Sequence, residues 1–184
     1  MSDQWKTLHQ SIAYDNPWIS VSHREVVAPT GKEGIYGVVN FKNVAVAVVP
    51  IDSQGNTWLV GQQRYPIGRY SWEVPEGGAP AGQSLLAAAQ RELREETGIV
   101  AGIWTSLLHA HMSNSVSDEY AIAFVAQQLH HTEIEPDDTE LLSIRKVPLD
   151  EVIQMAVDGH ITDAFSMMCL MKIRLMIERK ELVW

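Results

Sequence analysis

Cysteine, positive charge and long apolar runs are all scarce in this sequence. Cysteine occurs once in 184 residues, at Cys169, so the chain cannot form an internal disulfide, which fits a reducing cytoplasm. The 14 lysines and arginines stand against 23 aspartates and glutamates, which gives a formal net charge of −9 and no basic stripe for a nucleic-acid backbone. No apolar run has the length of a membrane span, and the N-terminal residues MSDQWKTLHQ lack the character of a secretory signal. We therefore expect a cytoplasmic protein that binds neither nucleic acid nor membrane.

Short apolar strand patterns separated by turn residues dominate the rest of the chain. We expect strands on either side of a turn at Asn16 and Pro17, within residues 8–28, and further strands at 36–41, 44–50, 102–108 and 120–129. Residues 53–56 predict a hairpin turn whose return strand begins at Trp58. Two helices are expected near the C-terminus, from Val147 to Gly159 and from Ile161 onwards.

The most informative segment is residues 77–99, with the sequence GGAPAGQSLLAAAQRELREETGI. Its second half predicts a helix, and Gly98 suits the left-handed position just past the last turn. Glycine and proline at residues 77–82 predict a loop before this helix.

Three carboxylates lie on one face of this predicted helix. Glu92, Glu95 and Glu96 have the spacing i, i+3 and i+4, so their side chains point the same way. Like charges repel, and the negative end of the helix dipole adds to the cost. A divalent cation would reverse that cost, and Mg²⁺ prefers carboxylate oxygens. A solvated acidic helix face is the alternative reading of these three residues alone.

The glycine loop and the acidic helix together resemble the Nudix box, G-x5-E-x7-R-E-U-x-E-E-x-G-U, where U is a bulky aliphatic residue. Eight of its nine positions match: Gly77, Arg91, Glu92, Leu93, Glu95, Glu96, Gly98 and Ile99. At the ninth position Gln83 stands where the family usually has glutamate. A glutamine there can still hydrogen-bond to Arg91 but contributes no charge.

This resemblance implies an α+β protein of the Nudix fold, in which a mixed β-sheet is sandwiched between α-helices, with an N-terminal β-strand extension. It implies that Glu92 and Glu96 bind Mg²⁺, or Mn²⁺ in its place, with Glu95 close by. The backbone carbonyl of Glu76 often joins the ligands in this family. We expect residues 1–42 to form the extension and residues 43–184 the Nudix domain.

Flanking segments resemble the ADP-ribose pyrophosphatase branch of the family. Residues 62–66, QQRYP, imply that Arg64 contacts substrate phosphate, which suits a guanidinium because it stays charged and can fork onto phosphate oxygens. In the run before the box, Glu73 either supports the metal ligands or ends a strand. Trp18 is the aromatic side chain that we expect to stack on the nucleobase. The branch also implies a homodimer whose N-terminal strands contact the partner.

Residues 113–119, SNSVSDE, lie where this branch often reads S-P-G-F-S-D-E. The final Ser-Asp-Glu is kept, but Asn114 and Ser115 replace the proline and glycine. That proline is associated with ADP-ribose preference, so the branch resemblance does not fix the substrate.

The general base is left open among four carboxylates. Relatives often carry a catalytic glutamate in the loop that corresponds to the acidic residues 133–140, which makes Glu140 the first candidate and Asp138 the second. Glu119 is the third candidate and Glu95 the fourth, because the base moves between Nudix branches.

The resemblance implies a Mg²⁺-dependent enzyme that hydrolyses the diphosphate bond of a nucleoside diphosphate linked to X. ADP-ribose or another nucleotide sugar is the expected substrate, with a nucleoside monophosphate and a sugar phosphate as products. A Nudix-fold sensor that binds such a ligand without turnover is the alternative. An RNA-decapping enzyme fits less well, because the net charge has the wrong sign.

Overall fold

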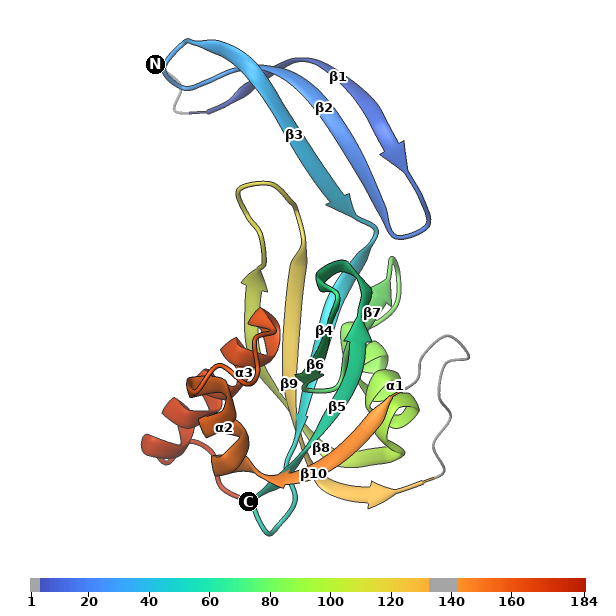
Figure 1. Ribbon diagram of the computed structural model, residues 1–184, viewed down its shortest axis with the longest axis vertical. Helices are drawn as coiled ribbons and strands as arrows, with labels where there is room; N and C mark the ends of the chain where they lie inside the picture. Colours follow the sequence, from blue (N-terminus) through green and yellow to red (C-terminus); the bar gives the residue numbers. More distant parts are fainter. Residues whose placement is uncertain (1–3, 133–141) are drawn as a thin grey trace.

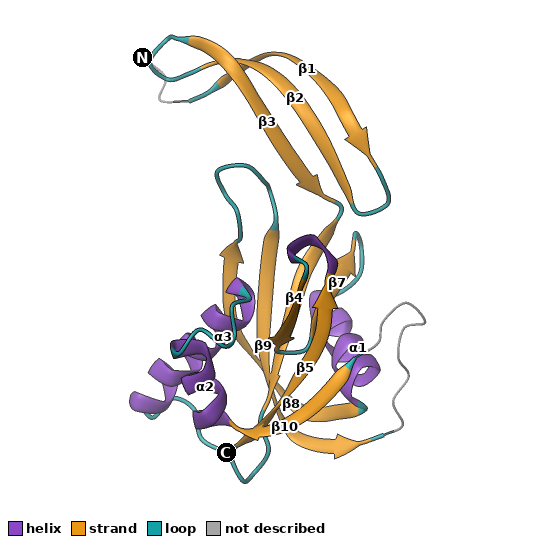
Figure 2. Cartoon of the chain, viewed as in Figure 1, coloured by secondary structure: helices purple, strands orange, loops and turns teal. Residues whose placement is uncertain are grey.

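The computed structural model describes residues 4–132 and 142–184, and in these residues the chain forms three β-sheets and three α-helices (Figure 1). The strands and helices are distributed over an N-terminal sheet and a larger α+β body (Figure 2). No helix in this described part is long and apolar enough to cross a membrane.

The N-terminal sheet is antiparallel and extends away from the rest of the molecule (Figure 1). Its strands are β1 (Lys6–Asp15), β2 (Ile19–Val27) and β3 (Glu33–Phe41). The predicted turn between the first two forms because the Asn16 side chain accepts hydrogen bonds from the backbone N–H groups of Trp18 and Ile19, both at 2.8 Å.

The body is built around a four-stranded mixed sheet of order β7-β4-β9-β8. Its strands are β4 (Asn43–Pro50), β7 (Glu76–Pro80), β8 (Ile99–His111) and β9 (Tyr120–His131). β4 runs parallel to β9, and the other pairs are antiparallel. The continuous apolar sequence of β4 arises because both of its faces are buried.

Helices cover the two faces of this sheet. On one face Val46 and Val48 of β4 pack in a core with Leu93 of α1 (Leu85–Thr97). On the other, alternate β4 residues pack with α2 (Leu149–Val157) and α3 (Ala164–Glu178). α1 begins at the cap Ser84, whose hydroxyl accepts the Ala87 N–H, and ends at Gly98 with φ +66°, as predicted.

A second sheet has the order β10-β5-β6 and is antiparallel. It consists of β5 (Asn56–Arg64), β6 (Arg69–Glu73) and β10 (Ser143–Pro148), with a short 3₁₀ turn (Tyr65–Ile67) between β5 and β6. The turn predicted at residues 53–56 is present, but the prediction that the strands on its two sides pair as a hairpin is wrong. β4 and β5 belong to different sheets, because β4 pairs with β7 and β9 while β5 pairs with β6 and β10.

The loop predicted for residues 77–82 is also partly wrong. Its first part is strand β7, in which Gly77 pairs with Val46 and Gly78 with Ala45. Glycine is needed here for close packing rather than for a turn, since a Cβ on Gly78 would lie 2.9 Å from the side-chain amide nitrogen of Asn43. Gly82, with φ +86°, does lie in a turn.

Asp52 fixes the turn that separates the two sheets. Its carboxylate accepts the backbone N–H of Asn56 at 2.8 Å and that of Gln54 at 2.9 Å, and it forms an ion pair with Lys146 of β10 at 2.8 Å. Partial burial acts to raise the pKa of Asp52, but the hydrogen bonds from Lys146 and Asn56 outweigh it and lower the pKa from 3.8 to about 2.

We expect Asp52→Asn to lower the free energy of unfolding by about 1 kcal/mol at pH 7, because an uncharged amide loses the ion pair and weakens the turn. Since the folded-state pKa is depressed, the stabilisation by Asp52 is full above the unfolded pKa of about 3.9 and is lost as pH falls towards about 2. Urea unfolding at pH 7 and at pH 3 measures this difference. Asp150→Asn, at an exposed carboxylate that contacts Arg174 at 3.5 Å, is the control and should change stability little. Equal stability of Asp52→Asn and the wild type at pH 7 would contradict the assignment.

Candidate active site

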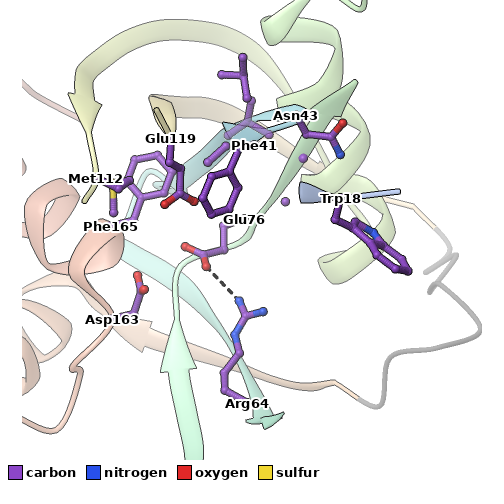
Figure 3. A pocket seen from close by; sticks show the side chains of 14 residues that line it. Trp18, Phe41, Asn43, Arg64, Glu76, Met112, Glu119, Asp163 and Phe165 are labelled. Atoms are coloured by element: carbon purple, nitrogen blue, oxygen red, sulfur yellow. Dashed lines mark hydrogen bonds and ion pairs between the residues drawn. The ribbon is translucent and has the colours of Figure 1, made fainter. Parts of the chain in front are cut away.

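A cavity of about 420 Å³ opens where the N-terminal sheet meets the body of the protein. Figure 3 shows that its lining side chains come from segments far apart in the sequence. They include Trp18 in the β1–β2 turn, Phe41 at the end of β3, Arg64 of β5, Glu76 of β7, Glu119 before β9, and Asp163 and Phe165 at the start of α3. Trp18, Arg64 and Glu119, each predicted from sequence as a site residue, therefore face one cavity.

Arg64 is held by two carboxylates at the edge of this cavity. Its Nε lies 3.0 Å from both oxygens of Glu73, and its Nη2 donates to Glu73 and, at 2.9 Å, to Glu76. Within the described residues these contacts leave Nη1 without a hydrogen bond. Burial favours the neutral guanidinium, but Glu73 and Glu76 raise the pKa of Arg64 above its ordinary value. The side chain is therefore a fixed positive charge with one edge still available.

Three carboxylates meet beside Arg64. Glu73, Glu76 and Asp163 each place an oxygen within 4.8 Å of the others. Oε2 of Glu76 is buried and has no hydrogen-bond partner among the described residues. Burial, and then the charges of Asp163 and Glu73, raises the pKa of Glu76 well above its ordinary value. This corner of the cavity therefore favours a proton or a cation.

The C-terminal half of α1 contacts the backbone of β7 through two carboxylates. Glu92 Oε1 accepts the Gly78 N–H at 3.1 Å, and Glu96 Oε2 accepts the Glu76 N–H at 3.0 Å. A Cβ on Gly77 would lie 2.2 Å from the Glu92 carboxyl carbon, so the approach requires glycine. Residues 76–78 themselves line the cavity. The two glutamates thus lie directly behind one of its walls.

Arg91 joins the remaining box residues. Its Nη1 pairs with Glu95 at 2.7 Å, and its Nη2 donates to Glu92 at 2.7 Å and to the Gly78 carbonyl at 3.0 Å. Burial raises the pKa of Glu92, and Arg91 offsets this only in part. Gln83 lies in the turn before α1, and within the described residues the Arg91 guanidinium makes no hydrogen bond to it.

The donor set along β7 suits a hard divalent cation. Glu92 is largely buried, Glu96 is 4% exposed, and both reach the short segment that carries the Glu76 carbonyl. Carboxylate and carbonyl oxygens are the ligands that Mg²⁺ and Mn²⁺ accept. The residues therefore fit the metal that the box implies.

Two of the four candidates for the general base lie within the described residues. Glu119 is half-buried and lines the cavity, and burial followed by the charge of Asp163 raises the pKa of its carboxyl. Glu95 is engaged by Arg91 at 2.7 Å. Glu140 and Asp138 lie outside the described residues, so their roles stay predictions.

Sequence reasoning missed Asp163, Phe41, Met112 and Phe165 as lining residues. Asp163 carried a readable signal as the residue before the last helix, where its carboxylate accepts the Ser166 N–H at 2.6 Å. Its proximity to Glu76 depends on how α3 packs against the sheet, and no local sequence pattern predicts that packing. The Phe and Met residues carried no signal that separates a cavity wall from a core.

Comparisons with known proteins agree with this geometry. Residues 41–166 match the model of the NUDIX domain, and residues 5–39 match that of the nucleoside diphosphate sugar hydrolase N-terminal domain. An ADP-ribose pyrophosphatase of Bacillus subtilis (strain 168) is 29% identical over 161 residues, which cover 86% of each chain. The ADP compounds hydrolase NudE of Escherichia coli (strain K12) is 30% identical over 132 residues, 71% of this chain and 69% of that one.

A solved structure of an ADP compounds hydrolase superposes with a TM-score of 0.87 at 24% identity and covers 98% of both chains. This match confirms the predicted α+β fold class. The NUDIX model itself spans more than half of the chain and includes the complete box. From its box, its fold and this match, the chain belongs to the Nudix family.

Proposed function

We propose that this protein hydrolyses the diphosphate bond of a nucleoside diphosphate linked to X, with ADP-ribose or another nucleotide sugar as substrate. The products are a nucleoside monophosphate and a sugar phosphate. The observation that carries this proposal is the contact of Glu92 and Glu96 with the backbone of residues 76–78, the same segment that lines the Arg64 cavity. The names of the Bacillus and Escherichia relatives support the same substrate class.

Charge accounts for the roles of the individual residues. A diphosphate is negative, and so is this protein, which makes a local positive clamp necessary. Arg64 supplies it, because Glu73 and Glu76 hold its Nε edge and leave Nη1 for a phosphate oxygen. Trp18, which is 66% exposed at the cavity, offers a face on which a nucleobase can stack.

Glu92 and Glu96 would hold Mg²⁺, or Mn²⁺ in its place, together with the Glu76 carbonyl. The bound metal neutralises phosphate oxygens and lowers the pKa of water. Attack of the water oxygen on one phosphorus breaks the bridging P–O bond, and a carboxylate within hydrogen-bond reach accepts the proton. Among the described residues Glu119 is the base candidate that lines the cavity. Glu140, Asp138 and Glu95 remain alternatives.

A Nudix-fold sensor that binds the same ligand without turnover is the second candidate. Gln83 favours it, because the box loses a carboxylate there. The placement of Glu92 and Glu96 opposes it, since ligand binding alone does not need two largely buried glutamates behind the cavity wall. We also propose a cytoplasmic location, from the single cysteine, which is buried at Cys169.

We expect the wild type to release a phosphate monoester from one member of a Mg²⁺-containing panel of ADP-ribose, GDP-mannose, UDP-glucose and NADH. Glu96→Gln should lower kcat by about 10³-fold, because loss of a metal ligand removes several kcal/mol of charge stabilisation. Glu178→Gln, at an exposed glutamate paired with Arg174, is the matched control and should retain activity. If no substrate is turned over while Mg²⁺-dependent ligand binding remains, the sensor is the correct reading.

We expect Arg64→Lys to lower kcat/KM by about 10- to 100-fold, because an ammonium group cannot fork between two carboxylates and a phosphate. Steady-state kinetics on the identified substrate measure the change. Arg69→Lys, at the exposed residue opposite Arg64 in the β5–β6 pair, is the control. A kcat/KM equal to that of the wild type in Arg64→Lys would contradict the proposed binding of substrate phosphate by Arg64.

We propose a homodimer that forms through the N-terminal sheet. Every residue of β1 is exposed, and this strand and its flanks carry large apolar side chains: Trp5, Leu8, Ile12 and Tyr14, each 52–57% exposed. Apolar side chains gathered on one exposed strand are typical of an interface. We expect sedimentation equilibrium to give twice the chain mass of 20.6 kDa.

In the same measurement Ile12→Glu should give the monomer mass, because a charge cannot be buried unpaired in the interface. Val157→Glu, at a 63% exposed residue on α2, is the control and should stay dimeric. A monomeric wild type would contradict the dimer.

A further inference from the structure

The connection between β8 and β9, residues 112–119, is attached to the N-terminal sheet. The Val39 N–H donates to the Val116 carbonyl at 2.9 Å, and the Asp118 N–H donates to the Val39 carbonyl at 3.2 Å. The Tyr36 hydroxyl donates to the Ser115 carbonyl at 2.6 Å. The β8–β9 connection therefore takes its position from β3 as well as from its own two strands.

Asp118 makes the most specific of these contacts. Its Oδ1 accepts the backbone N–H of Phe41, and its Oδ2 accepts the side-chain amide of Asn40, both at 2.8 Å. Both oxygens of an exposed carboxylate are thus used on two consecutive residues at the end of β3. Asn40 is held from its other side, since its Oδ1 lies 3.4 Å from the Ser22 hydroxyl. Charge-assisted hydrogen bonds of this kind are shorter and stronger than neutral ones.

The residues next to these bonds line the cavity. Phe41 receives one of them on its backbone, and Glu119 follows Asp118 directly in the chain. The side chains of both reach into the cavity in Figure 3. Glu119 makes no side-chain hydrogen bond within the described residues, so its carboxylate depends on the backbone for its orientation. That backbone is tied by the bond from the Met112 N–H to the Glu119 carbonyl, at 3.1 Å, and by Asp118.

We propose that Asp118 is a positioning residue, which fixes Phe41 and Glu119 relative to each other and so couples the N-terminal sheet to the substrate cavity. This inference rests on the proposed function, but it does not depend on whether Glu119 is the general base. Asp118 lies outside the cavity lining and acts through its neighbours. The N-terminal sheet then contributes Trp18 and Phe41 to the site and also positions Glu119.

Asp118→Asn tests the coupling because it keeps the shape of the side chain but sets its amide against the Asn40 amide. We expect KM for the identified substrate to rise about tenfold, and kcat to fall as well if Glu119 is the general base, whereas the metal-binding carboxylates Glu92 and Glu96 are untouched. Glu119→Ala should raise KM similarly, and Asp118→Asn should add little in that background, because residues that act through one another are not additive.

Exchanging the side chains of residues 40 and 118 distinguishes a loss of positioning from a general loss of structure. Asn40→Asp combined with Asp118→Asn restores a carboxylate opposite an amide, and we expect it to return KM to within about threefold of the wild type. Asp15→Asn is the matched control. It removes a carboxylate of the same sheet that pairs with Lys42 at 2.7 Å, and it should leave KM unchanged. An unchanged KM in Asp118→Asn, or a swap that does not restore it, would overturn the proposal.

Amide hydrogen exchange of residues 112–119 in the full-length protein gives a readout that needs no substrate. Exchange should be faster in Asp118→Asn, and it should be restored in the swap variant. If the wild type neither hydrolyses nor binds any nucleotide sugar, the proposed function fails, and this exchange measurement still decides the positioning role. Unchanged exchange in Asp118→Asn would overturn it in either case.

Discussion

The contact between the last turns of α1 and the backbone of β7 is the constraint on which the rest of the site depends. Two glutamates of one helix accept N–H groups of a strand, and glycine at Gly77 is what lets the Glu92 carboxylate come so close. Burying carboxylates costs free energy unless hydrogen bonds or cations compensate. Arg91 compensates for Glu92 and Glu95, while β7 supplies N–H groups to Glu92 and Glu96. Helix, strand and acidic donor set therefore form together.

Positive and negative side chains lie close together in the cavity beside this contact. Arg64 offers a positive edge towards a phosphate, but Glu73, Glu76 and Asp163 surround it with negative charge. Glu73 and Glu76 fix the guanidinium in place, while burial, and then the charges of Asp163 and Glu73, raises the pKa of Glu76. A negative ligand meets a single oriented cation here rather than a generally basic surface. This arrangement is consistent with a protein of net charge −9 that nevertheless binds a diphosphate.

The N-terminal sheet has two roles in the proposed enzyme. Its exposed apolar side chains suit a partner surface, and its end at Phe41 forms part of the cavity wall. The hydrogen bonds from β3 to residues 115–118 connect these roles physically. Without this sheet, Trp18 and Phe41 would be absent from the cavity, and the segment before Glu119 would lose the strand that supports it.

The sequence by itself determined the box helix with its three carboxylates, its glycine end at Gly98 and the buried strand β4, because each depends on local spacing or on a motif. It misassigned β7, because glycines that permit close packing look like glycines that permit a turn. It also paired β4 with β5, since a turn signal does not specify strand partners. Only the tertiary structure decided that Asp163 lies beside Glu76 and that Asp118 joins Phe41 to the Glu119 segment. Those contacts link residues about 77–87 positions apart, and such contacts follow from how sheets and helices pack rather than from local sequence.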